Sequence, residues 1–288
     1  MVAFLQALIN GCLIGGIYAL IATGLSLIWG VMRIINWAHG AMVMLSMYFT
    51  YFANALLGLD PLIALPFVAL TMFCVGYVLQ WVLMERILNR PLISKLAATF
   101  GLMVFLESLA LFLWSPNWRS VNVAYGILSF HVGGISISFP RLLSFIIALV
   151  IAVGLFQFLN RTELGRAIRA TAQNREAASL MGVNPYMVYR LTFGLGLALT
   201  GVAGSLLMTF YYVFPKVGFP FALTAYVVVV LGGLGNLKGA VLGGLILGIA
   251  EALGAFLIAP PLKGLVAFGI FMLVLFFKPE GLFGGVTE

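Results

Sequence analysis

The chain has 288 residues, of which 63% are hydrophobic and 8% are charged. Soluble domains contain about 45 to 50% apolar and about 25% charged residues, so this composition excludes a soluble protein and indicates a polytopic membrane protein. The formal net charge is +7, but the 15 basic residues are scattered near the ends of apolar runs. That distribution is typical of topology signals and argues against a nucleic-acid-binding surface.

Charged residues divide the chain into apolar runs, and a membrane-spanning helix needs about 20 such residues. The candidate spans are 1–32, 34–59, 61–84, 96–118, 142–160, 191–215, 217–237, 239–262 and 264–277. The last run is short and the seventh ends in glycines, so eight full spans plus one partial or re-entrant segment is an equally good prediction. We expect an all-α membrane fold of about eight or nine helices, forming one transmembrane domain over residues 1–288.

The basic residues also predict an orientation. If nine spans alternate, eleven Lys and Arg side chains fall on one side of the membrane and four on the other. The positive-inside rule then places the loop 160–190 in the cytoplasm, and the loop 119–141 and the N-terminus outside. The N-terminal side would reverse if an early run fails to span, whereas the basic 160–190 loop stays cytoplasmic.

Small residues recur within the spans at the spacing that lets helices approach closely in lipid. They occur at Gly11 and Gly15, at Gly239 and Gly243, and along Ala240, Gly244, Gly248 and Ala252. We interpret these stripes as helix packing. A different cluster, Gly232, Gly233, Gly235 and Asn236, ends the seventh run and predicts a helix break or re-entrant turn that shapes a transport pathway.

Two carboxylates lie at membrane depth, Glu107 and Glu251. A charge at the centre of a span costs at least about 2.5 to 3.5 kcal/mol, so both side chains should face protein or water. Glu251 lies beside the small-residue stripe, which places it at a helix interface, either as a structural group or in a pathway. Asn36 and His39 are one helical turn apart by their i, i+3 spacing in the cytoplasmic part of the second span, and they are further candidates for lining that pathway.

The outer loop predicts a β-hairpin. Polar and apolar residues alternate on both sides of Gly133 and Gly134, and a Gly-Gly pair between alternating runs is a two-residue hairpin signal. Pairing across this turn sets Val132 opposite Ile135 and His131 opposite Ser136. The hairpin should have one apolar and one polar face.

The cytoplasmic loop predicts a short capped helix at about residues 175–181. Asn174 is a good N-cap, Glu176 in the first turn suits the helix dipole, and Gly182 is a natural C-terminal stop. Its apolar side chains offer a compact surface that suits docking into a groove of another protein. They are Ala177, Ala178, Leu180 and Met181.

Glu176-Ala177-Ala178 followed by Gly182 resembles the coupling loop of ABC importer permeases. Further motifs resemble those of branched-chain amino acid permeases along almost the whole chain. These motifs are Gly11, Gly15, Gly16, Tyr18–Leu20, Gly24, Ile35–Gly40, Gly165–Ala167, Asn174, Gly232–Asn236, Gly239 and Lys278–Gly284. Trp37 stands where Phe is more usual, and the length is similar to the H-type rather than the M-type subunit.

The resemblance implies a permease that binds no cofactor itself and is not an enzyme. It implies a sister M-type permease, two ATPase subunits that use ATP, an external solute-binding protein and the bacterial inner membrane. The residues implied in ATPase coupling are Asn174, Glu176, Ala177, Ala178, Leu180, Met181 and Gly182. The chain has no Gly-Lys pair of a phosphate-binding loop, which agrees with nucleotide binding by another subunit.

Relatives of this branch carry branched-chain amino acids, urea, amides or other small solutes, so the solute stays open. The main alternative is a stand-alone secondary transporter or channel in which Glu107 or Glu251 couples to protons. A membrane enzyme is disfavoured, because no catalytic or metal-binding constellation occurs in the polar loops.

Overall fold

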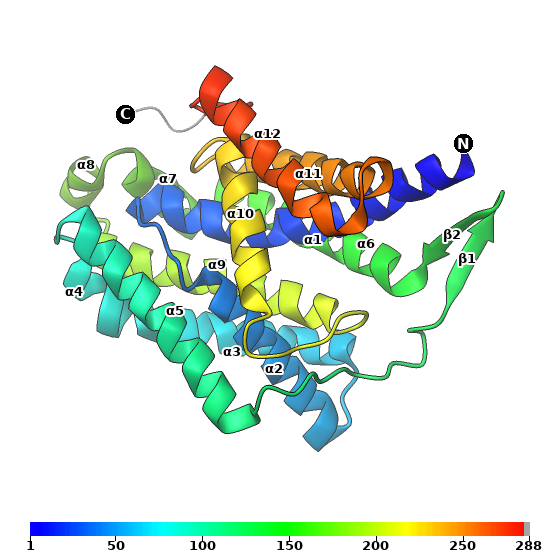
Figure 1. The fold of residues 1–288 in the computed structure, drawn as a ribbon. Helices are drawn as coiled ribbons and strands as arrows, with labels where there is room; N and C mark the ends of the chain where they lie inside the picture. Colours follow the sequence, from blue (N-terminus) through cyan, green and yellow to red (C-terminus); the bar gives the residue numbers. More distant parts are fainter. Residues whose placement is uncertain (285–288) are drawn as a thin grey trace.

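The computed structural model describes residues 1–284, and its fold is all-helical apart from one hairpin (Figure 1). Within that range, eight helices are long and apolar enough to cross a membrane. They are α1 (Val2–Met32), α2 (His39–Leu57), α3 (Pro61–Leu79) with its extension to Ile87, α5 (Leu92–Trp114), α6 (Phe139–Arg161), α9 (Pro185–Leu207), α11 (Leu237–Leu257) and α12 (Lys263–Phe277) with the preceding turn.

A ninth apolar helix, α10 (Gly218–Gly232), has only 15 residues. At 1.5 Å per residue it measures about 22 Å, which is shorter than the hydrocarbon core of about 30 Å. The structure therefore confirms a polytopic all-α fold, with eight full-length helices and one short one. The remaining short elements are a π-helix (Gln80–Met84), α4 (Glu85–Ile87), α7 (Glu163–Gln173), α8 (Arg175–Leu180) and a 3₁₀ turn (Pro260–Leu262).

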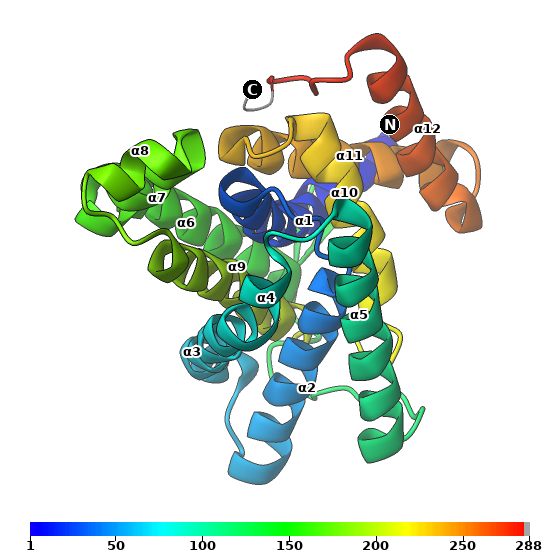
Figure 2. The same cartoon turned by 90° about the vertical axis from the view of Figure 1, so that its left-hand side faces the viewer.

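The first helix lies at the centre of the molecule. In Figure 2, α6, α9, α10 and α11 surround α1, and α1 packs against each of them. Of its most apolar stretch, 89% is buried, against 11% for α12 at the periphery. The periphery is thus free to meet lipid or partner subunits, whereas α1 organises the interior.

Close approach of α1 and α11 depends on the predicted glycine stripes. A Cβ atom added to Gly248 would lie 2.5 Å from the backbone oxygen of Gly11 and 2.5 Å from Cα of Gly15. A Cβ atom on Gly11 would lie 2.7 Å from the backbone oxygen of Gly248. The stripes are therefore packing surfaces, as the small-residue spacing predicts.

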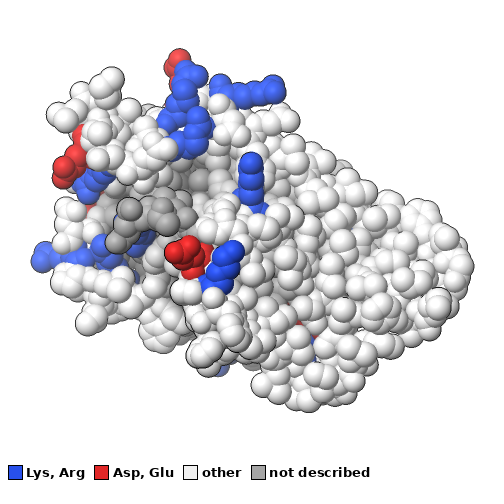
Figure 3. Space-filling model, turned by 90° about the horizontal axis from the view of Figure 1, so that it is seen from above, with Lys and Arg blue, Asp and Glu red and all other residues white. Residues whose placement is uncertain are grey.

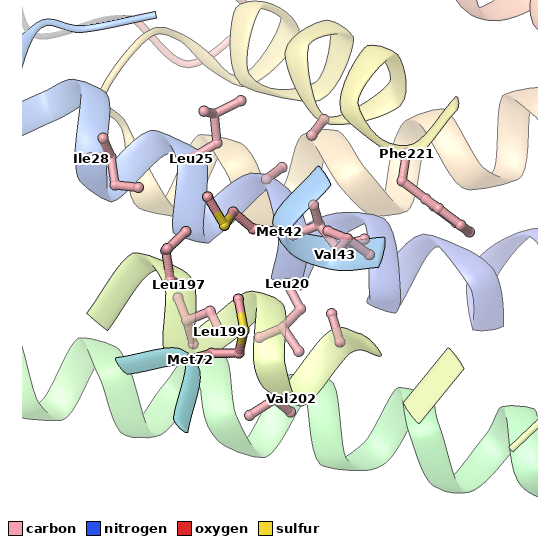
Figure 4. Close-up of a cluster of buried hydrophobic side chains, with 14 of the residues drawn as sticks. Leu20, Leu25, Ile28, Met42, Val43, Met72, Leu197, Leu199, Val202 and Phe221 are labelled. Carbon is pink, nitrogen blue, oxygen red and sulfur yellow. The ribbon is translucent and has the colours of Figure 1, made fainter. Parts of the chain in front are cut away.

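Buried aliphatic and thioether side chains fill the space between α1, α2, α3, α9 and α10 (Figure 4). Lipid tails are as apolar as the protein interior, so burial away from lipid gains little hydrophobic free energy. Such a core therefore contributes stability mainly through dispersion contacts between closely packed side chains. The labelled members in Figure 4 are Leu20, Leu25, Ile28, Met42, Val43, Met72, Leu197, Leu199, Val202 and Phe221.

The hairpin consists of β1 (Ser129–Val132) and β2 (Ile135–Ser138), paired antiparallel in the predicted register. Gly133 and Gly134 both have positive φ, at 57° and 82°, as a type I′ turn requires. The side chain of Gln6 accepts a hydrogen bond from Ser136 N at 2.8 Å and donates one to Ser136 O at 2.7 Å. The hairpin is therefore held against the start of α1.

The loop between α5 and the hairpin is anchored on α3. Asp60 caps α3 by accepting from Leu62 N at 2.9 Å, and Tyr125 Oη donates to the same carboxylate at 2.8 Å. Burial and this hydrogen bond raise the pKa of Tyr125 above its ordinary value. The neutral phenol is thus the form that fixes this loop.

Charge gathers at one end of the molecule. Figure 1 places α7 and α8 at the end opposite the hairpin, and Figure 3 shows most Lys and Arg side chains of its visible face toward the α8 end. Arg166 and Arg169 lie in α7, Arg175 begins α8, and Arg161 ends α6 directly before them. The loops 119–141 and 160–190 therefore lie at opposite ends of the molecule (Figure 1).

Candidate functional site

The predicted docking helix is present as α8, Arg175–Leu180. Asn174 Oδ1 accepts from Ala177 N at 2.9 Å, which caps the N-terminus. Gly182 has φ of +84°, its N–H donates to Ser179 O at 3.0 Å, and Val183 N donates to Ala178 O at 3.1 Å. These bonds close the C-terminus with a glycine in the left-handed region. The boundaries expected from the capping residues agree with the structure to within one residue.

The outer surface of α8 is apolar and accessible. Leu180 is 90% exposed and Met181 is 84% exposed, beside exposed Glu176 and Ala177. Ala178 differs from expectation, because it is buried and faces the chain itself. One turn of helix cannot present consecutive residues in the same direction, so Ala178 positions α8 instead of contributing to its docking surface.

Two tyrosines of α9 hold α8 in place. The Arg175 guanidinium lies 5.3 Å from the ring centroid of Tyr186 and 5.8 Å from that of Tyr189. Arg175 Nη2 also donates to Tyr186 Oη at 3.2 Å. This contact was not predicted from the sequence. The positive charge and the two aromatic residues one helical turn apart are its only sequence signal.

A second link joins α9 to the π-helix and α4, which continue α3 at its end. Arg190 donates to both carboxylate oxygens of Glu85, at 2.5 and 3.0 Å, and its guanidinium lies 5.7 Å from the Trp81 ring centroid. This bidentate pair is partly buried, which favours a fixed geometry. A displacement of α8 would therefore reach α9 through Arg175 and the end of α3 through Arg190.

Asn36 and His39 lie at the break between α1 and α2. Residues 33–38 are not helical, and His39 is the first residue of α2, so the expected placement of both residues on one helical turn is wrong. Instead, His39 N donates to Asn36 O at 3.0 Å in a turn. His39 Nε2 lies 3.0 Å from Ile21 O, and the amide group of Asn36 is buried with no hydrogen-bond partner in residues 1–284.

The predicted helix break at Gly232, Gly233 and Asn236 separates α10 from α11. Asn236 Oδ1 caps α11 by accepting from Gly239 N at 3.0 Å. Its amide nitrogen donates to the backbone oxygens of Phe283 and Gly284 at 3.1 and 3.0 Å. The C-terminal motif thus folds onto the break between α10 and α11. Because Phe283 and Gly284 are distant from Asn236 in the sequence, local patterns could not predict this contact.

Glu251 lies at the predicted interface of α1 and α11. Its side chain is buried, and Oε2 accepts from Tyr18 Oη at 3.0 Å. It also lines a cavity of about 380 Å³. Glu107 is half-buried on α5 and lines a separate cavity of about 320 Å³ with Lys216.

The candidate pathway residues lie at separate levels of α1. Glu251 contacts Tyr18, His39 lies beside Ile21, and Gly235 of the helix break approaches Gly30. The twelve residues from Tyr18 to Gly30 correspond to about 18 Å of helix. The structure therefore distributes these groups along the central helix and does not assemble them into one site.

Comparison with known proteins shows the family. The model of the branched-chain amino acid transport system / permease component matches residues 7–275. The permease proteins BraD of Pseudomonas aeruginosa and LivH of Escherichia coli K12 are each 35% identical, over 98% of this chain and 96% of theirs. A probable LivH of Methanocaldococcus jannaschii is 27% identical over 97% of this chain and 92% of its own length.

A solved structure supports the fold alone. PsaBC from Streptococcus pneumoniae in complex with Fab aligns with a TM-score of 0.50 and 14% identity, covering 96% of this chain and 92% of the solved one. Together with the eight apolar helices, the sequence relatives show a multi-pass membrane protein of the transport permease class. The chain belongs to the branched-chain amino acid transport system permease family.

Proposed function

We propose that this chain is a transmembrane permease subunit of an ABC importer in the bacterial inner membrane. It moves branched-chain amino acids or related small amphipathic solutes inward and pairs with a sister M-type permease. Two partner ATPase subunits hydrolyse ATP, and an external binding protein delivers the solute. The names of the relatives support this solute class, since BraD and LivH are described as branched-chain amino acid permeases.

The observation that carries the proposal is the exposed apolar end of a rigidly capped helix. Leu180 and Met181 are exposed at the end of α8, at the basic end of the molecule. The positive-inside rule assigns this end to the cytoplasm. Exposed apolar side chains on an otherwise polar loop are typical of a protein docking site. In this proposal, α8 docks into a cleft of an ATPase subunit.

The same geometry supports a lever mechanism. The caps at Asn174 and Gly182 make α8 a rigid unit, and Arg175 ties it to Tyr186 and Tyr189 of α9. When the ATPases close, α8 moves with them and displaces α9 and, through Arg190 and Glu85, the end of α3. Pathway opening to one side at a time follows as rigid-body movement of these helices. Asn36, His39, Glu251, Gly232, Gly233 and Asn236 are the proposed pathway residues.

Replacing both Leu180 and Met181 by Asp tests this docking. We expect the recovery of ATPase subunits with the tagged permease to fall at least about 10-fold, because well-packed anchor residues contribute about 2 kcal/mol or more to an interface. The measurement is co-purification from membranes, with the amount of folded permease held equal.

Ile127→Asp provides the matched control, since Ile127 is 93% exposed and belongs to the loop at the opposite end of the molecule. The control should retain the ATPase subunits. Equal recovery with wild type and with the double variant would contradict docking through α8.

A further inference from the structure

A cavity is lined by residues of α1, α6, α10, α11 and α12. Figure 1 shows that α1 and α6 both run to the end of the molecule that carries the hairpin. Its volume is about 380 Å³, within the range of about 300 to 1,000 Å³ typical of small-molecule sites. Most of its walls are apolar, with Ile14, Phe221 and Val227 among the lining residues. The space therefore suits a small ligand with an aliphatic part.

The cavity also contains a buried carboxylate. Glu251 is 7% exposed and is the only Asp or Glu among the buried side chains of residues 1–284. Tyr18 donates to Oε2, while Oε1 has no hydrogen-bond partner in that part of the chain. An oxygen of a carboxylate that faces a largely apolar cavity is available to a donor or cation that enters the cavity.

Two cationic side chains line the same cavity. Arg141 lies at the start of α6, with its guanidinium 5.5 Å from the Phe210 ring centroid, and Lys263 begins α12. Neither approaches Glu251 within the 4.0 Å of an ion pair. Charges of both signs therefore face one apolar space without neutralising each other directly.

We propose that this cavity binds a free amino acid with an aliphatic side chain. Its α-ammonium group pairs with Glu251, its α-carboxylate pairs with Arg141 or Lys263, and its side chain packs against Ile14, Phe221 and Val227. The proposal rests on the proposed function and deepens it by giving this subunit its own recognition of the solute. A ligand with both charges next to an aliphatic group complements the carboxylate, the two cationic side chains and the apolar walls of the cavity.

The depth of Glu251 favours an amino acid over a phospholipid. Glu251 lies six residues before the end of α11 at Leu257, which corresponds to about 9 Å along the helix. A lipid headgroup remains at the membrane surface, whereas a free amino acid can enter to this depth. The apolar walls around Glu251 then enclose its side chain.

The test uses the complete complex of both permeases and the ATPases in nanodiscs, without the binding protein. Equilibrium binding is measured with L-leucine, with leucinamide, which lacks the carboxylate, and with 4-methylpentanoate, which lacks the ammonium group. Glu251→Gln should weaken the binding of leucine and of leucinamide at least about 10-fold and leave the binding of 4-methylpentanoate unchanged. A combined Arg141→Gln and Lys263→Gln variant should weaken the binding of leucine and of 4-methylpentanoate and leave the binding of leucinamide unchanged.

Glu107→Gln is the matched control, because it removes the other membrane carboxylate from a different cavity, and its three affinities should equal those of wild type. This charge-specific pattern is one that a merely structural role of Glu251 would not produce. Equal leucine affinity of Glu251→Gln and wild type would overturn the proposal, and so would an absence of saturable leucine binding. If Glu251→Gln does not fold, the binding of the three ligands to the combined Arg141→Gln and Lys263→Gln variant tests the proposal.

ATP-driven leucine uptake by the wild-type complex is measured in parallel. Normal uptake without the charge-specific binding pattern overturns the cavity proposal alone. Loss of ATP dependence in wild type overturns the importer function instead.

Discussion

Gly248→Val is expected to prevent most of the chain from folding. The new Cβ atom would lie 2.5 Å from the Gly11 oxygen and from Gly15 Cα, and both contacts are with backbone that no rotamer change can move. Separation of α1 from α11 would open the interior around the central helix, which also packs against α6, α9 and α10. Overpacking costs about 1 to 3 kcal/mol even where side chains can adjust, and here they cannot.

Size-exclusion chromatography of detergent extracts measures this loss as the fraction of monodisperse protein. Gly269→Val is the matched control, because Gly269 lies in α12 with nothing within 4 Å of an added Cβ atom. The control should extract like wild type. Wild-type yield and melting temperature for Gly248→Val would refute the packing argument.

Gly182→Val is expected to reduce uptake strongly while leaving the transmembrane helices folded. Gly182 has φ of +84°, and a β-branched residue in that region costs about 1 to 3 kcal/mol in backbone strain. The hydrogen bonds that end α8 would break, and Leu180 and Met181 would lose their fixed position. Solute uptake by the assembled complex should fall at least about 10-fold.

Uptake and ATPase activity are measured together for this variant. Gly154→Val serves as the control, since Gly154 lies within α6 with open space around it. It should transport at the wild-type rate. If Gly182→Val couples hydrolysis to uptake normally, the assignment of residues 174–182 to ATPase coupling is wrong.

Local patterns account for the parts of the fold that the sequence predicted well. The turn at Gly133 and Gly134, between strands of period two, determines the hairpin register without help from the rest of the chain. Asn174 and Gly182 likewise define α8 through bonds to their own neighbours. Hydropathy located the spans, because a lipid environment requires long apolar helices.

Contacts between distant segments could not be predicted in the same way. Arg190 and Glu85 are 105 residues apart, and either could pair with other charges until the helices are placed. The hydrogen bonds from Asn236 to residues 283 and 284 could not be predicted for the same reason. Local spacing also misplaced Asn36, because the extended stretch before α2 interrupts the helix that the apolar run suggested.

The candidate pathway was predicted only in part. The sequence placed Glu251 at a helix interface, which the structure confirms, but it gave no sign of the Tyr18 contact or of the cavity shared with Arg141 and Lys263. Those groups come from four different helices, α1, α6, α11 and α12. Their convergence is a property of tertiary packing, and the role of each residue in transport stays a prediction.

Solute accumulation in proteoliposomes distinguishes the importer from a stand-alone carrier. The complete complex is reconstituted with ATP inside, at the ATPase face, and with leucine and the binding protein outside. We expect leucine uptake that requires ATP and is lost in the Leu180→Asp, Met181→Asp double variant. Accumulation by this chain alone without ATP, driven by a proton gradient and abolished by Glu251→Gln or Glu107→Gln, would contradict the account.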